Sequence, residues 1–300
     1  MKYILGVDAG STKTAAAVAD ESGKILGRGV GGAGNIHNAD CAKNLNEATE
    51  AALKNAGVER VDFASACFGI AGTDTEKSLE KAKQLASQII SAKNLLVVND
   101  IMLVRPACSD KKYGISVIAG TGSNFYGIDS HGNEERVGGL DYLLSDEGGA
   151  YRIGQKGMSA AAKSYDGRGE KTSIEGLIIG KFKVNTIRDF ADMVYSENFG
   201  KDEVAEVALL VDIAYRQGDA VAEKILSEAA GEIALAINTL IKKLDLQNDD
   251  WDIVAAGGEF RSPFPFEEKI KEQLTDGKDR FKVCVADPVE GAVKLALKEL

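Results

Sequence analysis

The chain has 300 residues, of which 44% are hydrophobic, and a formal net charge of −10. Its length predicts about two domains, and its hydrophobic content excludes a disordered chain. The sequence has no cluster of lysines and arginines, so we expect no nucleic-acid binding. No apolar stretch approaches the length of a membrane span, and Asp8 interrupts the first apolar run. We therefore expect a cytoplasmic protein without a signal peptide or a membrane partner.

Four cysteines, Cys41, Cys67, Cys108 and Cys284, are scattered along the chain without a C-x-x-C pair. Free cysteines behave as small buried hydrophobic residues, and disulfides are rare in reducing compartments. We therefore expect buried free thiols.

The first chemical motif is a small-residue turn near the N-terminus. An apolar strand over residues 4–7 runs into Asp8, and a second strand over residues 15–19 follows the turn. Gly10 lets backbone approach a ligand closely, and Asp8 can hold a hydrated cation. Hydroxyls and backbone N–H groups in such a turn suit a metal-bound polyphosphate, whereas an ordinary β-hairpin is the alternative. The turn consists of Gly10, Ser11, Thr12, Lys13 and Thr14.

A third strand over residues 25–30 completes a meander of antiparallel strands, and a loop follows over residues 31–38. Residues 29–34 match G-x-G-x-x-G, a pattern typical of nicotinamide enzymes. That fingerprint closes the first strand of a βαβ unit and opens a helix at once, whereas here it closes the third strand of a meander. We therefore do not favour a nicotinamide site. The loop carries three side chains that can hydrogen-bond a polyol: Asn35, His37 and Asn38.

Asp100 is the candidate proton acceptor of the first half. It follows a buried strand over residues 95–98, and the carboxyl ends of such strands face the ligand crevice in open α/β sheets. A carboxylate there can accept a proton from an attacking hydroxyl, or cap the next helix, or do both. The other elements expected here are a helix over 39–56 closed by Gly57, a strand over 61–70, a helix over 75–93, and a short helix over 101–109 broken near Pro106.

The strand–turn–strand pattern begins again at Gly114. Strands are expected over 115–119, 125–128 and 134–137, and the first turn of this second meander is again rich in Gly, Ser and Thr. Two such turns in equivalent positions can clamp a triphosphate, because backbone N–H groups bind phosphate without bulk. The second turn consists of Gly120, Thr121, Gly122, Ser123 and Asn124.

The rest of the chain is rich in helices, and alternating strands and helices make the fold α/β. Asp146 binds a ligand or caps a helix that starts near Glu147. The pair Gly257–Gly258 closes a late strand, where it lets a flat ring lie against backbone or simply makes a turn. The expected helices cover 147–165, 173–182, 187–197, 202–217, 219–244, 266–275 and 288–299, and the expected strands cover 251–256 and 281–285.

These motifs resemble the superfamily of acetate and sugar kinases, heat-shock chaperones and actin. Residues 6–14 look like its first phosphate motif, residues 119–124 like its second, and Gly257–Gly258 like its adenosine motif. Within it the chain is most similar to the BadF/BadG/BcrA/BcrD ATPase family, in the branch of N-acetylglucosamine kinase and the archaeal ATP-dependent hexokinases. The segments that carry this likeness are 34–38, 136–139, 143–148, 150–151 and 257–262.

The resemblance implies a duplicated ribonuclease-H-like fold, with two domains around a nucleotide cleft. The expected domains are residues 1–112 and a larger, helix-rich domain over 113–287, with the helix at 288–300 packing back on the first. ATP and Mg²⁺ are the implied cofactors, a small sugar is the implied partner, and a homodimer is the default assembly.

The same resemblance assigns roles to individual residues. Asp100 would be the general base on the sugar hydroxyl, and Asp8 would hold Mg²⁺ through water. Thr12, Thr121, Gly122 and Ser123 would hold phosphate. The sugar would be contacted by Asn35, His37, Gly72, Gly138, Gly139 and Asp146. The chain departs from the family pattern at Leu140–Asp141, where an aromatic residue and glycine are usual, and at Gly149, where serine is usual.

Three functions follow as hypotheses. The first is an ATP-dependent kinase acting on the 6-hydroxyl of glucose, glucosamine or N-acetylglucosamine, with Asp100 as base. The second is the ATPase activator of a 2-hydroxyacyl-CoA dehydratase, which carries an iron–sulfur cluster held by cysteines at a dimer interface. The third is a sugar-sensing or chaperone-like ATPase without a small-molecule acceptor.

Overall fold

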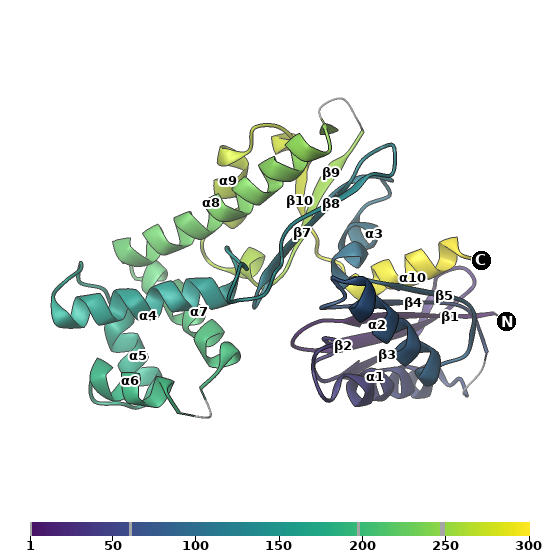
Figure 1. Ribbon diagram of the computed structural model, residues 1–300, viewed down its shortest axis with the longest axis horizontal. Coiled ribbons are helices and arrows are strands. Elements are labelled where there is room, and N and C mark those ends of the chain that lie inside the picture. The colour runs from purple at the N-terminus through teal and green to yellow at the C-terminus, as the bar shows by residue number, and fades with distance from the viewer. Residues whose placement is uncertain (1, 60–61, 197–198, 247–249) are drawn as a thin grey trace. The chain divides into compact units, whose positions relative to one another are not determined.

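The computed structural model describes residues 2–59, 62–196, 199–246 and 250–300 (Figure 1). The chain divides into two compact units. Unit 1 contains the residues up to Lys111 together with Cys284–Leu300, and unit 2 contains Lys112–Val283. Each unit has its own sheet and is described by itself.

Unit 1 is built on a five-stranded mixed sheet with the order β3-β2-β1-β4-β5. The first three strands pair antiparallel as the predicted meander, and β4 and β5 run parallel to β1. The strands are β1 (Tyr3–Ala9), β2 (Thr14–Asp20), β3 (Ile25–Gly31), β4 (Phe63–Ile70) and β5 (Ala92–Val98). The helices are α1 (Cys41–Ala56), α2 (Glu76–Ile89), η1 (Asp100–Leu103), α3 (Val104–Cys108) and α10 (Pro288–Lys298).

The two faces of this sheet are covered by different helices, because side chains of a strand alternate between faces. Leu5 and Val7 of β1 pack with residues of α1 and α2. Ile4, on the opposite face, packs with residues of α10. Gly6 allows the approach of α10, because a Cβ at this position would lie 2.7 Å from the backbone nitrogen of Val293.

Unit 2 repeats the same topology, with the sheet order β10-β9-β6-β7-β8. The strands β6, β7 and β8 form the antiparallel meander, and β9 and β10 run parallel to β6. The strands are β6 (Gly114–Ala119), β7 (Ser123–Ile128), β8 (Glu134–Gly138), β9 (Asp252–Ala256) and β10 (Phe281–Val283). The identical strand order in both units confirms the duplicated α/β fold.

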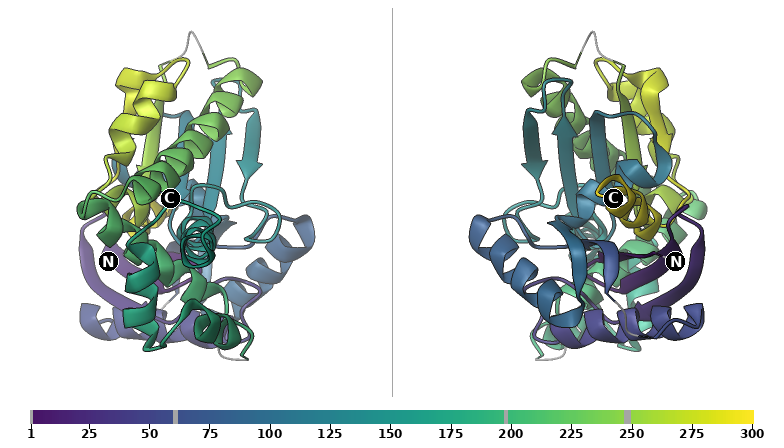
Figure 2. Two further views of the ribbon diagram at one scale, coloured as in Figure 1. Left: turned by 90° about the vertical axis from the view of Figure 1, so that its left-hand side faces the viewer. Right: turned by 90° about the vertical axis from the view of Figure 1, so that its right-hand side faces the viewer.

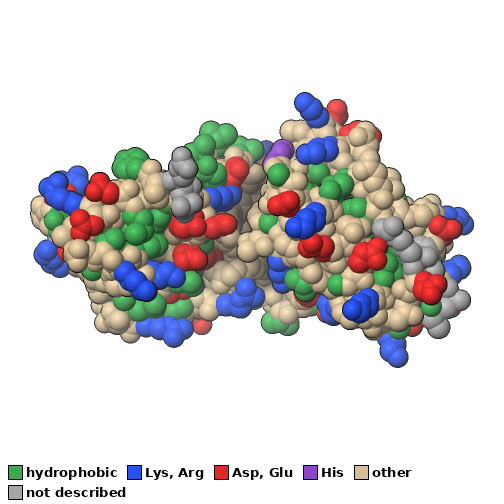
Figure 3. All heavy atoms as spheres, turned by 90° about the horizontal axis from the view of Figure 1, so that it is seen from below, with side chains coloured by type: hydrophobic (Ala, Val, Ile, Leu, Met, Phe, Trp, Pro, Cys, Tyr) green, Lys and Arg blue, Asp and Glu red, His purple; other side chains and the backbone are tan. Residues whose placement is uncertain are grey.

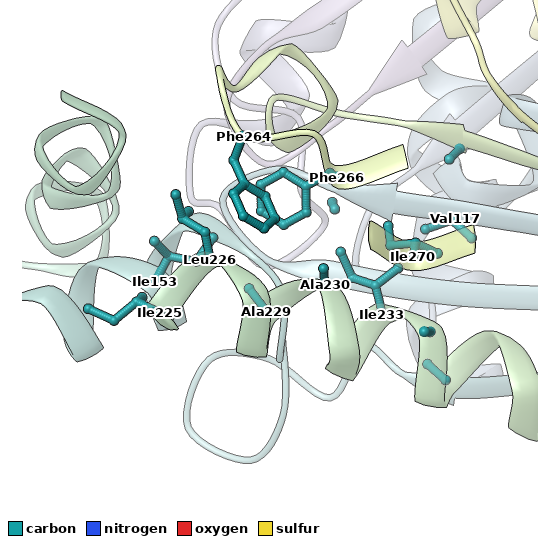
Figure 4. Packing of buried hydrophobic residues seen from close by; sticks show 14 of the residues in the cluster. Val117, Ile153, Ile225, Leu226, Ala229, Ala230, Ile233, Phe264, Phe266 and Ile270 are labelled. Carbon is teal, nitrogen blue, oxygen red and sulfur yellow. The ribbon is translucent and has the colours of Figure 1, made fainter. Parts of the chain in front are cut away.

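Unit 2 differs from unit 1 in the helices inserted between its third and fourth strands. These are α4 (Ala150–Asp166), α5 (Ile174–Phe182), α6 (Ile187–Val194), α7 (Lys201–Arg216) and α8 (Ala220–Lys243), and α9 (Phe266–Gln273) follows β9. Figures 1 and 2 show α8 and α9 along one face of this sheet. Their apolar side chains form one core with the strands and α4, including Val117, Ile153, Ile233, Phe266 and Ile270 (Figure 4).

Three predicted helix boundaries are wrong. The helix expected to reach residue 93 ends at Ile89, because Ala92 already pairs with Phe63 as the start of β5. Pro106 does not break a helix but lies in the first turn of α3, where its missing N–H costs no hydrogen bond. The helix expected from Glu147 starts at Ala150, because the preceding residues form a turn.

The prediction of free thiols is wrong for two cysteines. Cys108, the last residue of α3, forms a disulfide with Cys284, which precedes α10, whereas Cys41 and Cys67 are free and buried. The two half-cystines are 176 positions apart in sequence, so only the packing of α3 against α10 brings their Cα atoms to 5.6 Å.

None of the helices in the described ranges is both long and apolar enough to cross a membrane. Among the described residues on the face drawn in Figure 3, acidic and basic side chains alternate.

Candidate functional site

The first glycine turn, between β1 and β2, presents its polar side chains to solvent. The Gly10 N–H donates to the Lys13 carbonyl at 3.0 Å, which closes the turn. Ser11, Thr12 and Lys13 are exposed. Thr14 is different, because it is fully buried and its hydroxyl donates to the Gly32 carbonyl at 2.8 Å. Its burial argues against a direct phosphate contact by this side chain.

Asp8 lies near two further carboxylates of unit 1. Burial, together with the charges of Asp100 and Asp287, raises the pKa of the Asp8 carboxyl to about 8, while Lys13 acts in the opposite direction. Oδ1 of Asp287 is buried without a hydrogen-bond partner, while Oδ2 lies 4.0 Å from Arg28. Carboxylate oxygens that lack partners are suitable ligands for a hard cation such as Mg²⁺ or for its water shell.

The described residues contain no group of three His, Cys, Asp or Glu side chains arranged to enclose a metal ion. Sequence reasoning missed Asp287. Its only signal was an aspartate before Pro288 at the start of a helix.

Asp100 follows β5, as predicted, and its side chain shares a backbone donor with that of Asn99. Asn99 caps η1 by accepting from the Ile101 N–H, and its amide donates to Asp74 Oδ1 at 3.0 Å. Oδ1 of Asp100 accepts from the same Ile101 N–H at 2.9 Å, which fixes the carboxylate at the strand end. Asn99 and Asp100 therefore share the donor at the start of η1, so a capping contact and the predicted catalytic role remain compatible for Asp100.

Asn35, His37 and Gly72 come together in unit 1. Gly72 has a left-handed backbone, and a Cβ there would lie 2.7 Å from Asn35 Oδ1 and 3.0 Å from His37 Cδ2. The His37 N–H donates to Asn35 Oδ1 at 3.0 Å, and the Asn35 amide lies 3.5 Å from Ser11 Oγ. The predicted sugar contacts of this unit therefore adjoin the first glycine turn.

The second glycine turn, between β6 and β7, is bonded to the start of α4. The N–H groups of Ala150 and Tyr151 donate to the carbonyls of Gly120 and Thr121 at 2.8 and 3.0 Å. The Ser123 hydroxyl is buried and donates to the Glu147 carbonyl at 2.7 Å. A Cβ on Gly120 would meet no atom within 4 Å, so the surface above that residue is open to a ligand.

Asp146 is a buried carboxylate beside this turn. It accepts a hydrogen bond from the Ser123 backbone N–H, and its Oδ2 packs against Gly122. Burial raises the pKa of Asp146, and the ammonium of Lys201 acts against this shift. The helix-cap alternative is wrong, because Gly149 occupies the N-cap of α4. The backbone of Asp146 is left-handed, with φ of 67°, an uncommon conformation for a residue with a Cβ.

Gly138 and Gly139 end β8 next to the second turn. Both have left-handed backbones, with φ of 65° and 67°, and a Cβ on Gly139 would lie 2.5 Å from Asn124 Oδ1. The segment after Gly139 is bonded to Ser145, whose hydroxyl accepts from the Leu140 N–H at 3.2 Å. Glycine adopts these left-handed backbone conformations without strain, and at Gly139 it also leaves room for the Asn124 side chain.

Gly257 and Gly258 occupy the end of β9. Gly257 has a φ of 126° and packs directly on the backbone of Ala119, whereas a Cβ on Gly258 would meet no atom within 4 Å. Gly258 therefore leaves an open backbone surface, as a stacked ring requires. The next residue, Glu259, was missed by sequence reasoning. Its carboxyl is buried, and burial together with the charge of Asp212 raises its pKa to about 8.

A surface hollow of about 440 Å³ lies elsewhere in unit 2, against α4, α8 and α9. No predicted site residue lines it. Its lining includes Lys156, Glu228, Leu235 and Asn238.

Comparison with known proteins gives the family. The chain is 31% identical over 304 residues to an N-acetylmuramic acid/N-acetylglucosamine kinase of Clostridium acetobutylicum, covering 100% of this chain and 99% of the relative. It is 27% identical over 314 residues to an N-acetyl-D-glucosamine kinase of Dictyostelium discoideum, with 99% and 98% covered. The crystal structure of a candidate N-acetylglucosamine kinase of Chromobacterium violaceum shares the fold, with a TM-score of 0.80, 22% identity and 99% of both chains covered.

The model of the BadF/BadG/BcrA/BcrD ATPase family matches residues 5–296, which is nearly the whole chain. This match and the extended identity to the Clostridium acetobutylicum kinase agree with the resemblance expected from the motifs. The chain belongs to the BadF/BadG/BcrA/BcrD ATPase family.

Proposed function

We propose that this chain is an ATP-dependent kinase that phosphorylates the 6-hydroxyl of a hexose or amino sugar. N-acetylglucosamine is the first candidate, because both kinases that are similar over their full length are named for it. N-acetylmuramic acid is the second, because the Clostridium acetobutylicum kinase is named for it as well. The observation that carries the proposal is the repeated topology. Each unit presents a Gly/Ser/Thr turn between its first two strands, and Asp100 lies at the end of β5.

In the proposed reaction, Asp100 accepts the proton of the sugar hydroxyl as it attacks the γ-phosphorus of ATP. The exposed Ser11 and Thr12 and the backbone of the second turn hold the phosphates. Asn35, His37 and Asp146 hydrogen-bond the sugar hydroxyls, and the open backbone at Gly258 accepts the base. Catalysis then comes mainly from positioning the reactants and from electrostatic stabilisation.

Asp8 and Asp287 would hold Mg²⁺ through its water shell. We therefore expect the activity to depend on Mg²⁺. The ion would neutralise phosphate charge when bound. A homodimer and a cytoplasmic location are parts of the same proposal. Light scattering of the purified chain tests the first, and fractionation of the native cells tests the second.

The test is a coupled assay of ADP formation with glucose, mannose, glucosamine, N-acetylglucosamine, N-acetylmannosamine and N-acetylmuramic acid. Asp100→Asn should lose at least about a hundredfold in kcat, because the base is removed, while calorimetry shows ATP binding unchanged. Asp110→Asn is the matched control, because Asp110 is a fully exposed aspartate of the same unit. Near-normal turnover by Asp100→Asn would remove Asp100 from this role.

The dehydratase-activator alternative is less well supported. That function needs cysteines available to a cluster, but Cys41 and Cys67 are buried and Cys108 and Cys284 are joined to each other. ATP hydrolysis that no sugar stimulates, in a protein purified with iron, would favour the alternative.

A further inference from the structure

Lys201 lies beside two aspartates near the second glycine turn. It is the first residue of α7, and its Nζ is 2.6 Å from Asp141 Oδ1 and 3.9 Å from Asp146 Oδ2. The same ammonium lies 5.0 Å from the centroid of the Tyr142 ring. No motif of the sequence singled out this lysine, which is about 55 residues beyond Asp146 along the chain.

The carboxylate that Lys201 approaches is one that the fold isolates from water. The side chain of Asp146 is 6% exposed, whereas that of Asp141 is 67% exposed. A buried carboxylate is stable as an anion only if nearby donors or charges compensate for the lost hydration. For Asp146 this compensation comes from the Ser123 N–H and from Lys201, while Asp141 and Glu147 add negative charge. Arg152 lies 4.0 Å from Glu147 and offsets the negative charge of Glu147 rather than that of Asp146.

Asp141 has its own part in this arrangement. Its ion pair at 2.6 Å holds the Lys201 ammonium against the loop that connects β8 to α4. Both aspartates of the loop have left-handed backbones, with φ of 69° at Asp141 and 67° at Asp146. Such conformations persist only where surrounding contacts enforce them. Lys201 bridges the two strained positions from outside the loop.

We propose that Lys201 is a positioning residue of the sugar site, which holds the Asp146 carboxylate in place as an anionic hydrogen-bond acceptor for a sugar hydroxyl. The inference rests on the proposed function, in which Asp146 contacts the sugar. In this proposal Lys201 acts through Asp146, because its ammonium lies between the two aspartates, 2.6 Å from Asp141 and 3.9 Å from Asp146.

The test compares Lys201→Met with Lys201→Arg and with a control, Lys156→Met. Lys156 forms an ion pair of similar length with Glu228, at 2.9 Å, between α4 and α8 of the same unit. The readouts are KM for the sugar, KM for ATP, and the pH dependence of kcat/KM for N-acetylglucosamine from pH 5 to 9.

Lys201→Met should raise the sugar KM about tenfold and leave the ATP KM within about twofold, because one hydrogen bond to a charged acceptor is weakened. Removal of the positive charge raises the pKa of Asp146, so the acid limb of the profile should move to higher pH by about one unit. Lys201→Arg should keep the wild-type sugar KM within about threefold, and Lys156→Met should match wild type.

The results that would overturn this role are distinct from a failure of the proposed function. A wild-type protein that phosphorylates sugar, together with a Lys201→Met variant that keeps the wild-type sugar KM and acid limb, would exclude the role of Lys201 alone. A loss confined to N-acetylmuramic acid would also exclude it, because Lys201 would then bind the substrate carboxylate directly. No sugar phosphorylation by wild type would overturn the function and this role together.

Discussion

The two glycine turns occupy the same place in their units but differ in the side chains that they expose. In the first turn, Ser11, Thr12 and Lys13 are exposed. Its backbone is bonded through Gly10, whose N–H donates to the Lys13 carbonyl and whose carbonyl accepts from the Gly34 N–H. In the second, the Ser123 hydroxyl and the carbonyls of Gly120 and Thr121 are bonded to the segment that begins α4. The first turn therefore offers side chains to a ligand, whereas the second offers backbone held rigid by protein contacts.

Serine and threonine therefore have different roles at different positions of the two turns. In the first turn Ser11 and Thr12 are candidate ligands, whereas Thr14 is buried and its hydroxyl donates to a backbone carbonyl. Ser123 of the second turn resembles Thr14, because its buried hydroxyl also donates to a backbone carbonyl. Substitution of the exposed Ser11 or Thr12 should therefore weaken ligand binding. Substitution of the buried Ser123 should instead reduce stability or distort the geometry of the turn.

Gly122→Ala should have the largest effect. The Oδ2 of Asp146 packs directly on Gly122, so a methyl group there forces the carboxylate away from the turn. We expect a loss of about a hundredfold in kcat/KM, since a displacement of about 1 Å in a site can cost that much. Steady-state kinetics measure this. Gly176→Ala is the control, because a Cβ at Gly176 meets no atom within 4 Å. Wild-type kinetics in Gly122→Ala would contradict the packing described for Asp146.

Glu259→Gln tests the other buried carboxyl of unit 2. The pKa of Glu259 is raised from 4.5 to about 8, so between these values the folded state holds a proton that the unfolded state has lost. Wild-type stability therefore falls as pH rises through this window, and glutamine removes the dependence. From pH 5 to pH 8, the variant should gain on the order of 3 kcal/mol relative to wild type in denaturant unfolding.

Glu268→Gln, at an exposed position of α9, is the matched control for this measurement. Parallel stability profiles for wild type and Glu259→Gln would show that Glu259 titrates normally.

The smallest effects are expected for alanine substitutions of one hydroxyl in each turn, and they should differ between ligand binding and stability. Thr12→Ala should raise the KM for ATP several-fold without changing the melting temperature, because its side chain is exposed. Ser123→Ala should instead destabilise the fold by about 1 kcal/mol, because the Glu147 carbonyl loses its buried donor. Kinetics and thermal unfolding of both variants measure these changes. A stability loss in Thr12→Ala together with a raised KM for ATP in Ser123→Ala would contradict these two roles.

Much of the fold follows from local sequence patterns. The two meanders, the glycine turns and Asp100 at a strand end could be predicted because each depends on strand periodicity and turn residues close in sequence. Helix ends were less accurate, as at Ile89, where the pairing of Ala92 in β5 overrides helical propensity.

The parts that could not be predicted depend on contacts between residues distant in sequence. The disulfide of Cys108 and Cys284 requires α10 to pack against α3, and Lys201 reaches Asp146 only because α7 returns to the loop after β8. Asp287 approaches Asp8 for the same kind of reason. No local motif marks such pairs, so the structure was needed to find them.

The most direct measurement is phosphoryl transfer by the wild-type chain, with ³¹P NMR to identify the product. We expect ADP formation that requires an amino sugar or hexose and yields an equal amount of sugar 6-phosphate. Release of inorganic phosphate from ATP at the same rate with and without any sugar would contradict it.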